Sequence, residues 1–302
     1  MITVKMIIDI GVLCVTVLMM SAVGMDLEVR HFREVARGKW TLILTLVSQA
    51  VLLPMLGLAL TCIIALPPHL SAGILLLAAC PVGDIANFYT LLARANVALS
   101  VTLNTLSCLL SVVTMAAIFP VYDYFLGGRF AFAVPTPALI LRLTLIVVLP
   151  VLAGMAARRF IPAFVTRHAR TVRNISLTGI ALLLIFVMIA QRDRLAADWQ
   201  LTALAGAAFM AAAMATGLIF SRVLRLKAND SMTIGVVFSV RNVGLASAIA
   251  ITLLNRVEYA VFAVVYFLTE VPILLGAVAA YRQWWATTPQ PVQSAGGGNV
   301  IR

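Results

Sequence analysis

Two long apolar runs of the sequence are broken near their middle, by the stretches CPVGDIAN (residues 80–87) and SVRNVG (residues 239–244). Pro81 cannot donate to a helical hydrogen-bond ladder, and glycine tolerates backbone angles that other residues avoid. Backbone groups freed inside a membrane persist only where protein or a wet cavity satisfies them. The two breaks therefore decide the fold if the runs around them cross a membrane.

The composition indicates that they do. Hydrophobic residues make up 63% of the 302 residues, charged residues make up 11%, and the mean hydropathy is +1.07. Soluble domains contain about 45–50% apolar and about 25% charged residues. A soluble core of this length cannot bury so much apolar surface, whereas lipid covers it at about 20 residues per crossing. These values exclude a soluble enzyme, a nucleic-acid-binding domain and a disordered chain.

The hydropathy pattern predicts an all-α polytopic membrane protein. The nine expected spans are residues 6–24, 41–65, 70–93, 97–119, 136–157, 174–191, 200–221, 231–254 and 259–281. We expect one transmembrane domain over residues 1–286, followed by a disordered cytoplasmic tail at 287–302. Within the domain, a first repeat should cover about residues 1–119 and a second about residues 136–281.

The basic residues predict the orientation. Of the 22 Lys and Arg residues, 15 fall on one side of the nine spans, 6 fall on the other, and Arg241 lies within the eighth span. Because cytoplasmic loops carry the excess of Lys and Arg, the N-terminus should lie outside and the C-terminus in the cytoplasm. This bias accounts for the net charge of +11 without a polyanionic partner.

The two broken spans also point to a binding site. They lie five spans apart and therefore run in opposite directions, which is typical of inverted-repeat transporters with a site where the broken helices meet. The alternative is that Pro and Gly only kink two packed helices, but the matching positions favour a site. We expect a ligand beside Asp84, Asn87, Asn242 and Gly244, where half-helix N-termini offer partial positive charge to an anion.

The residues of both breaks resemble the bile acid:sodium symporter family. The stretch CPVGDIANFYTLLARANVALSVT (residues 80–102) is similar to that family's Cys-Pro-Gly-Gly start, Ser-Asn pair and Val-Ala-Leu-Ser-Val run. RNVGLA (residues 241–246) is similar to its Gln-Asn-Ser-Gly-Leu-Ala. The resemblance extends from about residue 10 to residue 281. It implies a bacterial-type transporter with inverted repeats that form a core and a smaller panel.

The resemblance also implies a sodium site, which this chain retains only in part. Four matching positions keep polar side chains: Gln49, Asn87, Ser100 and Asn104. The family's glutamate is replaced by Val237, and the glutamine of its second break by Arg241. Sodium prefers oxygen ligands, and one charge pair at about 4 Å is worth roughly 4 kcal/mol at an effective dielectric constant near 20. These replacements argue against sodium coupling, so no cofactor is expected.

Three ionisable residues lie well inside the apolar runs, namely Asp84, Arg241 and Glu270. Such groups are costly in a bilayer and mark a pathway or a partner. Asp84 and Arg241 could form a switchable ion pair, with Arg241 in the place of sodium, or a permanent salt bridge. Glu270 could carry a proton or bond to polar neighbours, and we favour polar neighbours. Its run Thr269-Glu270-Val271-Pro272 resembles the related arsenite permeases, but their first-break cysteine has no match here.

The leading hypothesis is a secondary transporter of a small organic anion in the bacterial inner membrane, expected to act as a monomer without nucleic acid. Its substrate contacts should come from Asp84, Asn87, Arg241, Asn242, Gly244 and Glu270. Coupling could use sodium or a proton, or be absent. The alternatives are a ligand-binding receptor on the same fold and an intramembrane enzyme. The enzyme is disfavoured because the sequence contains no phosphate-binding glycine loop, nucleophile elbow or zinc motif.

Overall fold

A computed structural model describes residues 2–26, 39–64, 66–128 and 136–287, where every extended regular element is a helix. The helices of the first half are α1 (Ile2–Asp26), α3 (Lys39–Ile63), α4 (Pro68–Ala79), α5 (Ile85–Leu92) and α6 (Val97–Phe125). Those of the second half are α7 (Thr136–Leu143), α8 (Leu149–Phe160), α9 (Pro162–Ala190), α10 (Arg192–Val223), α11 (Ala228–Ser239), α12 (Val243–Ala248) and α13 (Ala260–Thr287). A π-helical turn, η1 (Thr144–Val148), joins α7 to α8, and another, η2 (Ile249–Leu253), follows α12. The predicted tail after residue 287 lies outside the described residues.

The all-α polytopic fold is confirmed. Seven helices of the described residues are long and apolar enough to cross a membrane. The two remaining predicted spans, 70–93 and 231–254, correspond to the discontinuous pairs α4–α5 and α11–α12. Both predicted breaks are therefore present, because α4 ends at Ala79 and α11 ends at Ser239.

The starts of two predicted spans were wrong by more than two turns. The sixth span was expected at 174–191 and the seventh at 200–221, yet α9 begins at Pro162 and α10 begins at Arg192. Hydropathy detects only the apolar part of a helix, whereas Arg and Asp extend it without loss of backbone hydrogen bonds. Proline at the first helical position, as in α9, favours that start because its missing N–H has no intrahelical partner to lose.

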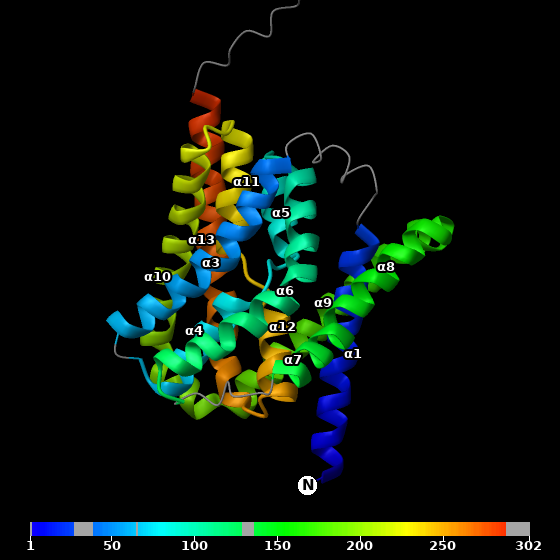
Figure 1. Ribbon diagram of the computed structural model, residues 1–302, viewed down its shortest axis with the longest axis vertical. Helices are drawn as coiled ribbons and strands as arrows, with labels where there is room; N and C mark the ends of the chain where they lie inside the picture. Colours follow the sequence, from blue (N-terminus) through cyan, green and yellow to red (C-terminus); the bar gives the residue numbers. More distant parts are fainter. Residues whose placement is uncertain (1, 27–38, 65, 129–135, 288–302) are drawn as a thin grey trace, which may run out of the picture.

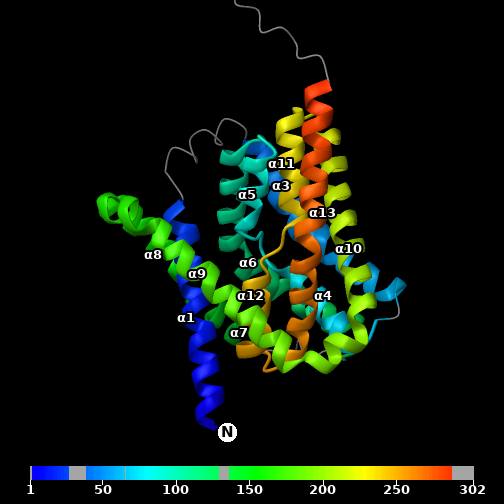
Figure 2. The same cartoon turned by 180° about the vertical axis from the view of Figure 1, so that it is seen from behind.

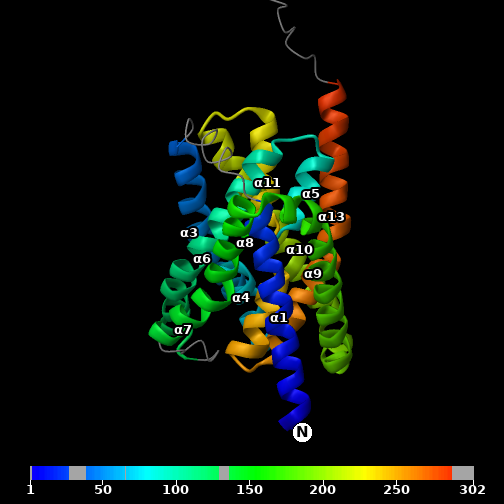
Figure 3. The same cartoon turned by 90° about the vertical axis from the view of Figure 1, so that its right-hand side faces the viewer.

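The helices form two packed groups. Helix α1 packs mainly against α8 and α9, whereas α10 packs against α11 and α13, and α3 packs against α4. Figures 1 and 2 show α1 and α8 on one side of the molecule, with α10 and α13 on the other. Figure 3 shows α1 in front of the helices that contain the breaks.

Helices α1 and α8 approach each other backbone to backbone. A Cβ atom at Gly154 would lie 2.1 Å from the carbonyl oxygen of Ser21, and one at Gly24 would lie 2.1 Å from that of Val151. Small residues permit this closeness between membrane helices, where packing and not the hydrophobic effect drives association. Gly24 and Gly154 therefore allow α1 and α8 to pack at this close distance.

Burial separates the interior of the molecule from its apolar surface. Every residue from 232 to 251 is buried, so α11 from its second turn on, the second break and α12 lie in the interior. Helix α3 instead exposes Ile43, Val47 and Met55, and α9 exposes Leu182 and Ile189. Apolar side chains that face outward on long helices are what lipid contact requires.

Candidate functional site

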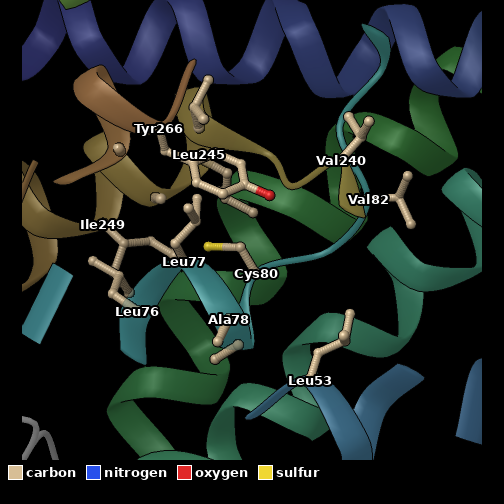
Figure 4. Close-up of a cluster of buried hydrophobic side chains, with 14 of the residues drawn as sticks. Leu53, Leu76, Leu77, Ala78, Cys80, Val82, Val240, Leu245, Ile249 and Tyr266 are labelled. Carbon is tan, nitrogen blue, oxygen red and sulfur yellow. The ribbon is translucent and has the colours of Figure 1, made fainter. Parts of the chain in front are cut away.

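The two breaks cross each other as a short antiparallel pair. Val82 and Arg241 form an isolated antiparallel bridge, in which the Asn242 amide donates to the Pro81 carbonyl (3.0 Å) and the Gly83 amide donates to the Val240 carbonyl (3.3 Å). Figure 4 shows Val82 and Val240 on the two segments that pass each other. Each break thus satisfies backbone groups that the other has freed, as membrane burial requires. The predicted opposite directions of the two segments are confirmed at this point.

Glycine is required at position 83 because the crossing leaves no room for a side chain. A Cβ atom there would lie 2.7 Å from the Arg241 carbonyl oxygen and 3.3 Å from Cγ1 of Val240. The backbone φ of Gly83 lies outside the left-handed region. Among the glycines of the described residues, only Gly127 and Gly128 have a φ in that region. The missing side chain, not unusual backbone geometry, lets the second break come close.

A cluster of polar side chains joins the first break to α6. Nδ2 of Asn104 donates to Oδ1 of Asp84 (2.8 Å), and Oγ of Ser100 donates to Oδ1 of Asn87 (2.8 Å). The structure therefore brings four of the predicted site residues together. Ser107, which the sequence reasoning missed, also belongs here because its Oγ accepts a hydrogen bond from the Val82 amide (3.1 Å). Its position one turn after Asn104 on the same helix was the available signal.

Asn242 and Gly244 lie at the start of α12. Oδ1 of Asn242 caps this helix by accepting a hydrogen bond from the Leu245 amide (2.9 Å), while its Nδ2 is buried without a partner. A Cβ atom at Gly244 would lie 3.2 Å from Sδ of Met19 and 3.3 Å from Cγ1 of Ile180. The second break therefore faces α1 and α9 at the boundary between the two helix groups.

Arg241 is enclosed beside Gln49. Its side chain is 3% exposed, and Nη2 donates to the Ala78 carbonyl (3.3 Å), whereas Nε and Nη1 have no partner. The guanidinium lines a cavity of about 20 Å³ together with Gln49 and Ser107, which is room for about one water molecule. Oε1 of Gln49 is also buried and unpaired. A cationic group thus shares a small cavity with one of the predicted sodium-site residues.

The ion pair between Asp84 and Arg241 is not formed, which corrects that expectation. Asp84 accepts from Asn104 on α6, whereas Arg241 donates to the carboxyl end of α4. The backbone bridge explains the difference, because it pairs Arg241 with Val82 and leaves Asp84 two residues further on. In the part of the chain that the structure describes, no carboxylate pairs with Arg241.

Glu270 lies apart from these clusters on α13. Its side chain is fully buried, and neither carboxyl oxygen has a hydrogen-bond partner. The expectation that it bonds to polar neighbours is therefore wrong for this structure. Within the described ranges, no group of three or more His, Cys, Asp and Glu side chains is arranged to hold a metal ion.

Comparisons with known proteins agree with this geometry. The profile described as "Sodium Bile acid symporter family" matches residues 13–198. The chain is 24% identical over 250 residues to the "Uncharacterized sodium-dependent transporter YocS" of Bacillus subtilis, an alignment that covers 82% of this chain and 76% of that protein. It is 30% identical over 149 residues to the "Probable sodium/metabolite cotransporter BASS2, chloroplastic" of Oryza sativa, covering 49% of this chain and 34% of the relative.

A second plant relative, the "Probable sodium/metabolite cotransporter BASS1, chloroplastic" of Arabidopsis thaliana, is 25% identical over 76% of this chain and 56% of its own length. The chain thus spans three quarters of its bacterial relative but a smaller share of the two plant proteins. The family profile matches more than half of the chain, including the whole first break and the residues of α6 that bond to it. With a crossing of two broken helices inside an apolar bundle, the chain belongs to the sodium bile acid symporter family.

Proposed function

We propose that this protein is a secondary transporter of a small organic anion in which Arg241 supplies the positive charge that a bound sodium ion supplies in the family. One observation carries the proposal: the Arg241 guanidinium is buried beside Gln49 with two nitrogens unpaired and no carboxylate partner among the described residues. Arginine does not lose its proton in proteins. The positive charge is therefore built into the site.

The remaining donor set fits a sodium ion poorly. Val237 is fully buried where a glutamate is expected, and Oδ1 of Asn87 already accepts from Ser100. A sodium ion in the cavity beside Gln49 would meet the Arg241 guanidinium. Repulsion between two unit charges at about 4 Å amounts to roughly 4 kcal/mol at an effective dielectric constant near 20. That penalty corresponds to about a thousandfold loss of affinity.

An anion is the ligand that such a site lacks. An unpaired charge at membrane depth costs several kcal/mol, and neither Asp84 nor Glu270 compensates Arg241 in this structure. We infer that the substrate carries a negative charge and lies beside Asp84, Asn87, Asn242 and Gly244. The cavity beside Arg241 holds only about one water molecule. Residues of α3, α4 and α6 line it, so admission of an organic anion requires these helices to move apart at this point.

We also propose that the protein lies in the bacterial inner membrane with its N-terminus outside. The C-terminal ends of α8, α10 and α13 lie toward one end of the molecule, and the N-terminus of α1 lies toward the other (Figure 1). Those three ends carry Arg158, Arg159, Arg222 and Arg282. The positive-inside rule assigns that end to the cytoplasm.

Counterflow in proteoliposomes tests the proposal. The purified full chain is loaded with unlabelled cholate, pyruvate or succinate, and uptake of the same labelled anion is followed in sodium or potassium buffer at fixed pH and membrane potential. We expect counterflow of at least one of these anions at equal rates in both buffers. Arg241→Gln should abolish it, whereas the matched control Arg142→Gln, which removes an exposed arginine of α7, should retain it.

A double variant tests the role of the charge. Val237→Glu combined with Arg241→Gln restores the residue types of the family and should make counterflow depend on sodium. A severalfold stimulation of the unmodified protein by sodium over potassium would refute the proposal. Thermal stabilisation by an anion without counterflow would indicate a receptor instead.

A further inference from the structure

Glu270 is a buried carboxyl group that neither the fold nor the proposed charge of Arg241 explains. It lies in the interior of α13, one turn after Tyr266, with no exposed surface and with both oxygens unpaired. Two residues later Pro272 interrupts the hydrogen bonds of the same helix. A residue whose oxygens neither stabilise the helix nor bond to a neighbour needs another explanation.

The groups around Glu270 offer it no positive charge. Helix α13 packs against α4, α5, α9, α10 and α12, and against the 3-10 turn Val257–Tyr259 that precedes it. Glu258 and Tyr259 of that turn lie eleven or more residues before Glu270 in the sequence. Two tyrosines come within electrostatic reach of Glu270: Tyr89, from α5, and Tyr266, from α13 itself. In α4 and α10 the charged and titratable side chains lie near the helix ends, and in α9 they lie in the first half of the helix. Helix α12 has no such side chain. Among the described residues, no Lys, Arg or His forms an ion pair with Glu270.

An ionised carboxylate in such surroundings is strongly disfavoured. Transfer of a lone charge into an apolar interior costs so much that the group neutralises instead. Neutralisation of a carboxylate means that one oxygen binds a proton and becomes an O–H donor, while the other remains an acceptor. Tyr89 is 1% exposed, its hydroxyl also has no hydrogen-bond partner in this structure, and it lies within electrostatic reach of Glu270.

We propose that Glu270 is a proton-binding site inside the bundle and that its proton, in place of sodium, couples to transport. The site rests on burial and surroundings alone, whereas the coupling rests on the proposed function. In the coupling step, the Glu270 carboxylate binds one proton from the acidic side of the membrane and releases it on the other side. No electrons are transferred and no other bond is formed or broken.

The contacts of the two tyrosines connect this site to both breaks. Tyr89 lies on α5, the half-helix that also carries Asn87. The Tyr266 hydroxyl donates to the carbonyl of Ser239, the last residue of α11, and lies within electrostatic reach of both Glu270 and Arg241. Loss of the proton would change the charge beside Tyr266, and we infer that Arg241 responds through this tyrosine. Binding of a proton and binding of a substrate anion near Arg241 must then influence each other reciprocally.

Infrared spectroscopy tests the site without a substrate. The purified full chain in liposomes is titrated from acid to alkaline pH, and the C=O stretching band of a protonated carboxylic acid in apolar surroundings is followed. We expect a band that is present at neutral pH, is lost at alkaline pH and is absent from Glu270→Gln. Asp193→Asn, which removes a carboxylate that is 94% exposed, should leave the band unchanged.

Tyr89→Phe covers the case in which Glu270→Gln does not fold. It retains Glu270 and should keep the band but move its titration midpoint. A band that is identical in the unmodified protein, Glu270→Gln and Tyr89→Phe would overturn the site, and so would its absence from the unmodified protein at every pH.

Transport by the same liposomes tests the coupling. A pH gradient should drive accumulation of whichever of cholate, pyruvate or succinate shows counterflow. Glu270→Gln should lose that accumulation, whereas the exposed control Asp193→Asn should keep it. Accumulation by Glu270→Gln equal to that of the unmodified protein would overturn the coupling. A Glu270 band in a protein that shows no counterflow would support the proton site and refute the proposed function.

Discussion

Replacement of Gly83 by alanine tests whether the two breaks depend on close backbone approach. The new Cβ atom would lie 2.7 Å from the Arg241 carbonyl oxygen, and ordinary contact begins at about 3.4 Å, so the segments must separate by about 0.7 Å. The Gly83–Val240 hydrogen bond, already 3.3 Å long, would then be lost. Overpacking costs about 1–3 kcal/mol, and loss of the hydrogen bond adds about 1 kcal/mol.

Alanine also reduces the entropy of the unfolded chain, which offsets about 0.4–1 kcal/mol. The net expectation is a loss of about 1–3 kcal/mol. At about 2–4 °C per kcal/mol for chains of 150–250 residues, the melting midpoint should fall by several degrees.

The assay is thermal unfolding of the detergent-purified protein, followed by tryptophan fluorescence. Gly276→Ala is the matched control, because a Cβ atom at this position of α13 meets nothing within 4 Å. Alanine is favoured over glycine inside helices by up to about 1 kcal/mol, so the control should melt at the same temperature or slightly higher. Equal midpoints for Gly83→Ala and Gly276→Ala would refute the geometry of the crossing.

Two further predictions concern the packing of α1 and the orientation of the chain. Gly154→Leu should lower the melting midpoint more than Gly83→Ala does, because its Cβ atom would lie 2.1 Å from a backbone oxygen of α1; an unchanged midpoint would contradict the helix contact. A cysteine at Thr166 in a cysteine-free background should resist a membrane-impermeant maleimide added to intact cells, whereas one at Asp193 should react. Labelling of residue 166 from outside would reverse the predicted topology.

The sequence could predict where the helices break but not where the side chains at the breaks point. Pro81 and the glycines interrupt apolar runs in a way that hydropathy and backbone chemistry make visible. The pairing of Asp84 with Asn104, and of Arg241 with the Ala78 carbonyl, depends on the register of the antiparallel bridge. A slip of one residue in such a pair turns side chains to the opposite face, and nothing in the sequence sets that register.

The early starts of α9 and α10 could not be predicted for a different reason. Residues 162–173 and 192–199 are polar enough to end an apolar run, yet a helix at the edge of a membrane needs no apolar side chains to keep its backbone hydrogen bonds. Hydropathy reports what lies in lipid, and helix length is a separate property. The surroundings of Glu270 were also hidden, because they come from helices distant in the sequence.

The register of the bridge has a functional consequence of its own. Because the backbones of the two breaks bond to each other, Asp84 and Arg241 need not neutralise each other to hold the crossing together. Asp84 is stabilised by an amide donor from α6, while the Arg241 charge is left uncompensated. A permanent salt bridge would have been hard to break, since removal of one partner from a buried pair costs about 3–5 kcal/mol. An arrangement in which backbone hydrogen bonds carry the structure leaves the arginine available to respond to an anion, and Glu270 available to respond to a proton.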